Sequence, residues 1–247
     1  IEAMKAHLLP KVLQFLEKPP AQAQQRPIGS FDKTLPFTQK PASWSPQAIV
    51  IGSSTGGPEA LRQVLSQFSD EANVPYFIVQ HMPALFTKEL ARMLSKICPI
   101  PVKEATHNEI VKAKTIYLAP GDYHMNLTWS KDRLIQIQLD QSEKVNYVRP
   151  AVDKLFESAA QIYGKDILAV VLTGMGQDGL KGAQELKSIG AKVVIQDEES
   201  SVVWGMPGAI SKANCHDKVL SLSQIGSFIN EALSQGSQVF GDMKEGA

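Results

Sequence analysis

From residue 48 onward, short apolar runs alternate with segments whose apolar residues recur every three or four positions. Apolar runs of four to six residues predict buried strands, and spacing of three or four predicts helices with one buried face. The expected strands are residues 48–52, 76–80, 115–119, 167–172, 192–196 and 218–222. The expected helices are a segment opened by Pro58 and residues 85–97, 151–163, 180–189 and 225–233. This alternation predicts a mostly parallel sheet with helices on both faces.

One pair of strands has a different pattern. Residues 125–129 and 134–139 alternate apolar and polar side chains on either side of a Ser-Lys-Asp turn, which is typical of an antiparallel hairpin. A segment rich in glycine, Trp-Gly-Met-Pro-Gly at residues 204–208, predicts a loop. The expected fold class is therefore α/β, with three layers, a doubly wound and mostly parallel sheet, and an antiparallel edge hairpin.

The first 46 residues differ from the rest of the chain. Apolar residues have helix-like spacing in residues 1–17, where Pro10 interrupts them, and residues 18–47 are rich in proline and glutamine without any period. We expect an N-terminal arm and linker at residues 1–46, one catalytic domain at 47–236 and a tail at 237–247. Because the first residue is Ile and a linker comes early, a piece of a longer protein is expected, although a terminal arm fits equally well.

The overall composition excludes several classes of protein. The 247 residues include 25 basic and 25 acidic ones, so there is none of the basic excess that indicates nucleic-acid binding. No apolar run approaches the roughly 20 residues of a membrane-spanning helix, and no membrane insertion is expected. Cys98 and Cys215 have neither disulfide-scaffold numbers nor metal-ligand spacing. These features favour a soluble protein of the reducing cytoplasm, without a bound metal.

A candidate nucleophile, Ser54, follows the first expected strand. The sequence Gly-Ser-Ser-Thr-Gly at residues 52–56 fits the G-x-S-x-G turn, in which a strand leads into a helix and the serine is exposed. The start of the next helix would direct backbone N–H groups at developing negative charge. The same motif fits a phosphate-binding loop with a serine capping the helix, and the motif alone does not separate the two. No lysine follows the glycines, which excludes a Walker-type loop.

Two further residues at strand ends would complete a catalytic triad. His81 directly follows the strand at 76–80 and could act as a general base, and Asp178 follows the strand at 167–172 and could orient that histidine. Each also has a structural interpretation, as a packed histidine and as a helix cap. The other histidines are alternatives for the base: His7, His107, His124 and His216.

The segment around Asp178 also supports a different function. Gly174, Gly176 and Gly179 form the G-x-G-x-x-G pattern of dinucleotide-binding proteins, and Asp197 lies near the expected position of a ribose-binding acid. Met175 and Gln177 are bulky for a pyrophosphate turn, and the pattern occurs late in the chain. The residues alone put a hydrolase only slightly ahead of this alternative.

Six segments, in this order, resemble the catalytic domain of the chemotaxis protein-glutamate methylesterases. They are AIVIGSSTGG at 48–57, VQHMP at 79–83, IYLAPGD at 116–122, RPAVD at 149–153, LTGMGQDG at 172–179 and WGMPGA at 204–209. The resemblance implies the triad Ser54, His81 and Asp178, and an oxyanion hole formed by the backbone N–H groups of Thr55 and Met175. It implies hydrolysis of glutamate methyl esters on methyl-accepting chemoreceptors, with glutamine deamidation as a related activity and no cofactor. Family members commonly have a phosphorylatable receiver domain before a linker, whereas this chain has only the arm and linker.

Overall fold

The computed structural model describes residues 44–71 and 73–240 of the chain. Seven parallel strands form one sheet, as the alternation of apolar runs predicts. Their order across the sheet is β3 (Val102–Glu104), β4 (Ile116–Leu118), β2 (Tyr76–Gln80), β1 (Ala48–Ser53), β7 (Ile167–Val171), β8 (Lys192–Gln196) and β9 (Lys218–Leu220). Strand β1 is in the centre, and the chain order reverses there, between β2 on one side and β7 on the other. Ligands of such sheets bind beyond the carboxyl ends of the strands at this point.

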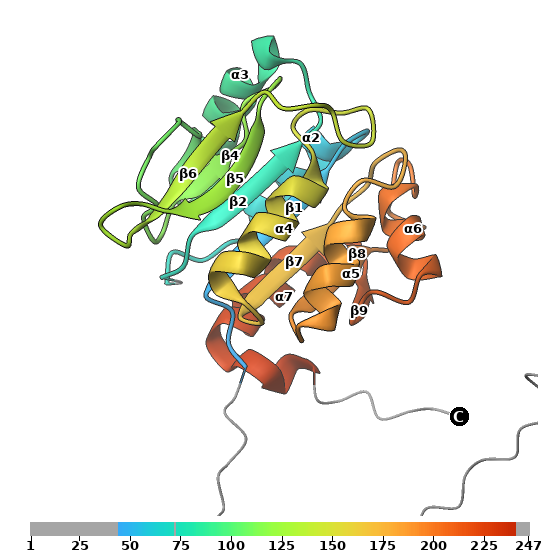
Figure 1. The fold of residues 1–247 in the computed structure, drawn as a ribbon. Coiled ribbons are helices and arrows are strands. Elements are labelled where there is room, and N and C mark those ends of the chain that lie inside the picture. Colours follow the sequence, from blue (N-terminus) through green and yellow to red (C-terminus); the bar gives the residue numbers. More distant parts are fainter. Residues whose placement is uncertain (1–43, 72, 241–247) are drawn as a thin grey trace, which may run out of the picture. The chain divides into compact units, whose positions relative to one another are not determined.

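Helices cover both faces of the sheet (Figure 1), so the predicted three-layer α/β fold is confirmed. The helices are α2 (Gly57–Leu65), α3 (Ala84–Ser95), α4 (Val152–Tyr163), α5 (Leu180–Ser188), α6 (Met206–Lys212), α7 (Leu222–Gln235) and the 3-10 helix η1 (Gly236–Phe240). Figure 1 shows α4 and α5 side by side across one face. No helix among the described residues is both long enough and apolar enough to cross a membrane.

Alternate side chains of β1 supply the two cores. Ile49 and Ile51 pack with the apolar residues of α2, α3 and α7, whereas Ala48 and Val50 pack with those of α4, α5 and α6. All four side chains are fully buried. Burying a side chain the size of isoleucine or valine contributes about 1.5–3 kcal/mol, so a central strand apolar on both faces holds the two layers together. This packing fixes the position at which the chain leaves β1.

The predicted antiparallel hairpin is present as a separate two-stranded sheet. Strand β5 (His124–Trp129) pairs with β6 (Ile135–Asp140) from His124 opposite Asp140 to Trp129 opposite Ile135. Its inward residues Met125, Leu127 and Ile137 join the core beside α4. The hairpin leads directly into the loop that precedes α4, which is one side of the site described below.

Three elements differ from the expectation from sequence, the first being the 3-10 helix η1, whose residues Val239 and Phe240 pack against the core although they were expected in a C-terminal tail. The segment predicted as a loop at 204–208 contains the start of α6, whose first turn includes Pro207. Proline and glycine in a first helical turn resemble a loop in sequence, because proline lacks the N–H that this turn does not need. Strand β3 was not predicted because its sequence, Val-Lys-Glu, contains no apolar run. At the domain edge, Trp44 donates its Nε1–H to the Lys165 carbonyl (2.8 Å) and packs edge-on against Phe240.

Candidate active site

The three residues predicted to form a triad follow three neighbouring strands. Ser54 directly follows β1, and His81 directly follows β2. The two strands are in register, with Ser53 opposite Gln80, and the His81 N–H donates to the Ser53 carbonyl (3.1 Å). Asp178 lies in the segment after β7, which pairs with β1 on its other side. The parallel sheet therefore brings all three residues to one edge.

The turn after β1 holds Ser54 by close backbone packing. Gly56 has a φ of 81°, a conformation that glycine adopts without strain, and α2 begins at the next residue. The Ser54 N–H donates to the Thr173 carbonyl (3.0 Å), and a Cβ on Gly174 would lie 2.8 Å from the Ser54 Cβ. Ser54 itself is only partly buried. Its side chain is thus held at the surface of the sheet edge by Thr173 and Gly174, in the segment that follows β7.

Gln80 ties the backbones of Ser54 and His81 together. This side chain is 2 % exposed, and its Nε2 donates to the carbonyl of Ser54 (3.0 Å) and to that of His81 (2.9 Å). Its Oε1 accepts a hydrogen bond from the Ser53 hydroxyl (2.7 Å). All three polar contacts of the buried amide are satisfied, so the separation between the two backbone segments is fixed.

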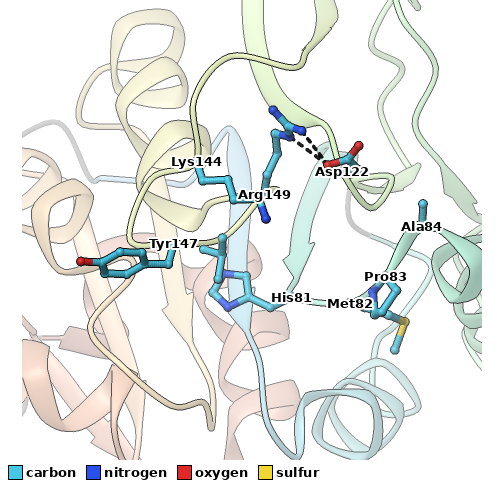
Figure 2. A pocket seen from close by; sticks show the side chains of 9 residues that line it. His81, Met82, Pro83, Ala84, Asp122, Lys144, Tyr147 and Arg149 are labelled. Carbon is cyan, nitrogen blue, oxygen red and sulfur yellow. Dashed lines mark hydrogen bonds and ion pairs between the residues drawn. The ribbon is translucent and has the colours of Figure 1, made fainter.

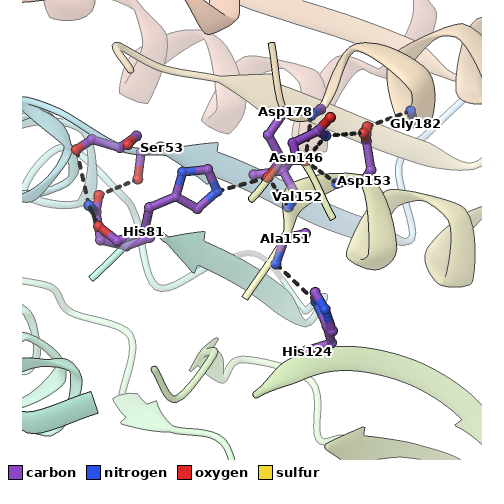
Figure 3. Close-up of polar contacts among 12 residues, drawn as sticks. Ser53, His81, His124, Asn146, Ala151, Val152, Asp153, Asp178 and Gly182 are labelled. Carbon is purple, nitrogen blue, oxygen red and sulfur yellow. Dashed lines mark hydrogen bonds and ion pairs between the residues drawn. The ribbon is translucent and has the colours of Figure 1, made fainter. Parts of the chain in front are cut away.

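His81 and Asp178 are in direct contact (Figure 3). The His81 Nε2–H donates to Asp178 Oδ2 over 2.8 Å, and the carboxylate is almost fully buried. An ionised carboxylate only accepts hydrogen bonds, so Nε2 carries the hydrogen and Nδ1 has a free lone pair in the neutral ring. A general base requires this tautomer.

Asp178 is surrounded by donors, chiefly from the start of α4. The backbone N–H groups of Val152 (2.6 Å), Asp153 (3.2 Å) and Gly179 (3.1 Å) donate to its carboxylate, as does the Asn146 amide (3.0 Å). Burial raises the Asp178 pKa, but the hydrogen bond and charge of His81, together with these donors, outweigh burial, and the net pKa lies below its usual range. The carboxylate therefore remains ionised at neutral pH.

The Ser54 hydroxyl makes no hydrogen bond to His81 or to any other residue in the described part of the chain. The structure thus joins two of the three predicted residues and brings the third to the adjacent strand end. Contacts between nucleophile and base are commonly long without substrate. The Thr55 and Met175 N–H groups, which the sequence suggests for the oxyanion hole, also have no acceptor among the described residues.

The alternative histidines have other roles or lie elsewhere. His107 Nδ1 accepts from the Leu139 N–H (3.1 Å), and His124 is fully buried between two backbone groups of the loop before α4. The buried Nδ1 of His216 has no hydrogen-bond partner among the described residues. His7 lies outside the described residues. No group of three or more His, Cys, Asp or Glu side chains in the described ranges has the arrangement of a metal site.

The segment of the dinucleotide pattern is occupied by protein. A Cβ on Gly174 would lie 2.4 Å from Met206 Sδ, so α6 covers the first glycine. Asp197, the candidate ribose-binding acid, accepts hydrogen bonds from the N–H and hydroxyl of Ser200 instead. A pyrophosphate needs open backbone at the first glycines, and the dinucleotide alternative is not favoured.

A cavity of ≈ 430 Å³ adjoins His81. Its lining residues are His81, Met82, Pro83, Ala84, Asp122, Lys144, Tyr147, Val148 and Arg149. Figure 2 shows Arg149 paired with Asp122 above the imidazole and Tyr147 beside it. Tyr147 is 95 % exposed, and Pro83 and Ala84 of the lining are also exposed. Exposed apolar side chains of this size around a cleft are typical of a surface that contacts another molecule.

Comparison with known proteins decides the family. The family model described as CheB methylesterase matches residues 49–229. The chain belongs to the CheB methylesterase family. In this family, a protein-glutamate methylesterase/protein-glutamine glutaminase of Maricaulis maris is 49 % identical over 181 residues, 73 % of this chain and 45 % of that protein. A second one, from Caulobacter vibrioides, is 45 % identical over 210 residues, 85 % of this chain and 59 % of that protein.

A solved structure of the CheB family has the same fold. The crystal structure of the Thermotoga maritima CheB methylesterase catalytic domain is 42 % identical, with a TM-score of 0.73, over 76 % of this chain and 98 % of that one. The chain spans about half the length of the curated CheB-family relatives it matches. The likeness therefore covers a whole catalytic domain but only part of those longer proteins.

Three supporting residues of the site were not predicted from sequence: Gln80, Asp153 and Asn146. Gln80 and Asp153 lie within the motif segments at 79–83 and 149–153, but no role was assigned to either. Asn146 lies just outside those segments. A polar residue in an otherwise apolar strand, as Gln80 is in β2, is a signal that could have been used, because a buried amide needs partners.

Proposed function

We propose that this chain is a serine hydrolase that removes methyl esters from glutamate side chains of chemoreceptors and deamidates receptor glutamines. Ser54 is the nucleophile, His81 the general base and Asp178 the residue that orients His81. The main support is the 2.8 Å contact between His81 Nε2 and Asp178, which leaves Nδ1 as the base at the strand end beside Ser54. Membership of the CheB methylesterase family supports the same reaction.

The reaction has two acyl-transfer steps. The Ser54 hydroxyl attacks the ester carbonyl carbon and gives its proton to His81 Nδ1, and the ionised Asp178 stabilises the imidazolium. Backbone N–H groups of Thr55 and Met175 stabilise the oxyanion, where one donor contributes about 2.7–4 kcal/mol. His81 then protonates the departing methoxide, and methanol leaves. Water attacks the acyl-enzyme with His81 as base, which releases the glutamate and restores Ser54; with a glutamine substrate, ammonia leaves instead.

The substrate is a side chain on another protein. The cavity beside His81 is lined in part by exposed apolar residues, among them Tyr147 and Pro83, which suits a protein segment lying across the site. We propose that this segment belongs to a chemoreceptor and that the reaction takes place in the cytoplasm. Methanol release from methylated receptor membranes, compared with release from other methylated proteins, would test the substrate class.

Replacement of the nucleophile tests the proposed function. Ser54→Ala should abolish methanol release from methylated receptor membranes, and deamidation of receptor glutamines should be lost with it. Ser66→Ala, at the exposed end of α2, is the matched control and should keep full activity. Wild-type activity in Ser54→Ala would show that the nucleophile is a different residue.

We propose that residues 47–236 are the catalytic unit and that a receiver domain lies on its N-terminal side in the intact protein. The greater length of the curated relatives and the family resemblance support this arrangement. A small-molecule phosphodonor should then raise methanol release by the intact protein and leave the activity of residues 44–240 unchanged. An equal response of both would contradict it.

A further inference from the structure

A two-residue turn in the loop between β6 and α4 carries Asn146. Val145 and Val148 exchange both backbone hydrogen bonds (3.2 and 3.0 Å) around the two residues between them. Asn146 has a φ of 52° and Tyr147 a φ of 66°, both left-handed. Turns of this kind favour asparagine first and glycine second. A tyrosine at the second position is strained, so contacts of the turn must hold this conformation.

The side chain of Asn146 makes contacts that hold the turn. Its Nδ2 donates to Asp178 Oδ1 (3.0 Å) and to Asp153 Oδ2 (2.9 Å), so one amide bridges two carboxyl groups (Figure 3). Both facing atoms are carboxyl oxygens, so the amide nitrogen and not its oxygen must point towards them. The two hydrogens of the amide match the two acceptors.

The bridge determines how Asp178 is oriented. Its Oδ2 accepts hydrogen bonds from the His81 ring and the Val152 N–H, and its Oδ1 accepts hydrogen bonds from the Asn146 amide and two backbone N–H groups. Asn146 is the only side chain among the described residues that donates to Oδ1. Without it, Asp178 and Asp153 would face each other, and repulsion would favour rotation of the Asp178 carboxylate away from the plane in which it meets His81.

The loop that presents Asn146 is anchored at both ends. The buried His124 donates from Nε2 to the Glu143 carbonyl (3.0 Å) and accepts the Ala151 N–H at Nδ1 (3.2 Å). Arg149 donates to the carbonyls of residues 141 and 142 and pairs with Asp122. The turn is therefore held against the site and is not a freely moving loop tip.

We propose that Asn146 is a positioning residue, which orients the Asp178 carboxylate and thereby keeps His81 in the tautomer with hydrogen on Nε2. This role rests on the proposed function, because it acts through the proposed triad. Asn146 reaches neither the Ser54 hydroxyl nor the predicted oxyanion donors, so it should affect the chemical step and not substrate binding.

The first test deletes the amide without straining the turn. Asn146→Gly suits a φ of 52°, so the fold should be kept while both hydrogen bonds are lost. We expect kcat to fall about 10-fold with an unchanged KM, the change that loss of one hydrogen bond to a charged group produces. The matched control is Asn126→Ala, which removes an asparagine–aspartate hydrogen bond in β5 (2.6 Å to Asp140) and should leave kcat unchanged.

The second test adds charge. Asn146→Asp places a third carboxylate next to Asp153 and Asp178, and the added negative charge favours protonated His81. The acidic limb of the pH profile of kcat/KM should move to higher pH, whereas Asn146→Gly should move it less. The other charged groups that face His81 are its partner Asp178 and three residues that line the cavity, Lys144, Arg149 and Asp122. Neither variant changes any of these four groups.

A spectroscopic measurement separates this proposal from the proposed function. The proton in the His81–Asp178 hydrogen bond should give a downfield NMR resonance in the wild type, which Asn146→Gly should shift or broaden and Asn126→Ala should not. This signal does not depend on activity, so it tests Asn146 even if Ser54→Ala keeps activity and the triad chemistry is wrong. Wild-type kcat, pH profile and resonance in Asn146→Gly would overturn the proposal. If Asn146→Gly fails to fold, the isosteric Asn146→Asp decides by the same two measurements, and an unchanged pH profile and resonance overturn it.

Discussion

Replacing Asp178 with asparagine keeps the shape of the side chain and changes only its charge and one acceptor. In the structure both carboxylate oxygens are surrounded by donors: the His81 ring and the Val152 N–H at Oδ2, and Asn146 with two backbone N–H groups at Oδ1. An asparagine has one oxygen, so its NH₂ group must face donors on one side. Oδ2 faces two donors and Oδ1 faces three, so the orientation that leaves fewer donors without an acceptor places the NH₂ group towards His81 and Val152.

This choice predicts a large effect on the rate. An NH₂ group facing His81 Nε2 must donate to it, so the hydrogen of the neutral ring moves to Nδ1, where it blocks acceptance of the Ser54 proton. The equivalent replacement in a trypsin-type triad lowers kcat about 10⁴-fold through the same change of tautomer. We expect a decrease of about 10³–10⁴ in kcat for Asp178→Asn.

The effect on stability is smaller. One backbone donor, the Val152 N–H, loses its acceptor in a buried place, which costs about 1–3 kcal/mol. Removal of the Asp178 charge relieves its repulsion of Asp153, whose pKa is raised by burial and by that charge, and this offsets part of the loss. A net loss of about 2 kcal/mol would lower Tm by about 4–8 °C.

Methanol release measures the rate, and thermal unfolding followed by circular dichroism measures Tm. Asp166→Asn, the same change at the opposite end of β7, is the control and should keep wild-type kcat. A kcat for Asp178→Asn within about tenfold of the wild type would refute the role of Asp178 in setting the tautomer.

Three other changes test different parts of the site. Gly174→Ala should remove most activity, because its methyl group would lie 2.8 Å from the Ser54 Cβ and 2.4 Å from Met206 Sδ. Gly176→Ala meets no atom within 4 Å and bears only the backbone strain of its φ of 88°, so it should keep more activity than Gly174→Ala, as kinetics on both variants would show. Gln80→Met should lower kcat and Tm together, since it leaves the two carbonyls and the hydroxyl it binds without a partner; unchanged thermal unfolding would argue against the bridge. The pKa of Asp217 in the folded protein lies below its usual value, because hydrogen bonds from two lysines and a backbone N–H outweigh the effect of burial. Ionised Asp217 therefore stabilises the folded state above the usual pKa of 3.8, and this stabilisation is lost as the pH falls below that value. Urea midpoints should therefore fall less steeply below about pH 4 in Asp217→Asn than in the wild type.

The sheet and the strand ends could be predicted because each depends on local sequence. Buried strands such as β1 are continuous apolar runs, and the rule that ligands bind beyond the carboxyl ends of the strands applies once the sheet is parallel. Residues 204–208 misled the prediction, since Pro207 and two glycines look the same in a loop and in the first turn of a helix.

The contacts that support the site depend on long-range packing and could not be predicted. Asn146 meets Asp178 across 32 positions, and Gln80 meets Ser54 across 26. Neither spacing has a period, and both contacts exist only after the loops of separate strands come together. A resemblance of motifs suggested the triad, but the motifs do not show which donors hold each member in place.

Covalent labelling tests most directly whether Ser54 is a nucleophile activated by His81. A serine-directed phosphonate would be incubated with the wild type and with His81→Ala, and the adduct located by mass spectrometry of proteolytic peptides. We predict one adduct per chain, on Ser54, with labelling strongly slowed in His81→Ala. An adduct on a different residue, or equal labelling in His81→Ala, would contradict this mechanism.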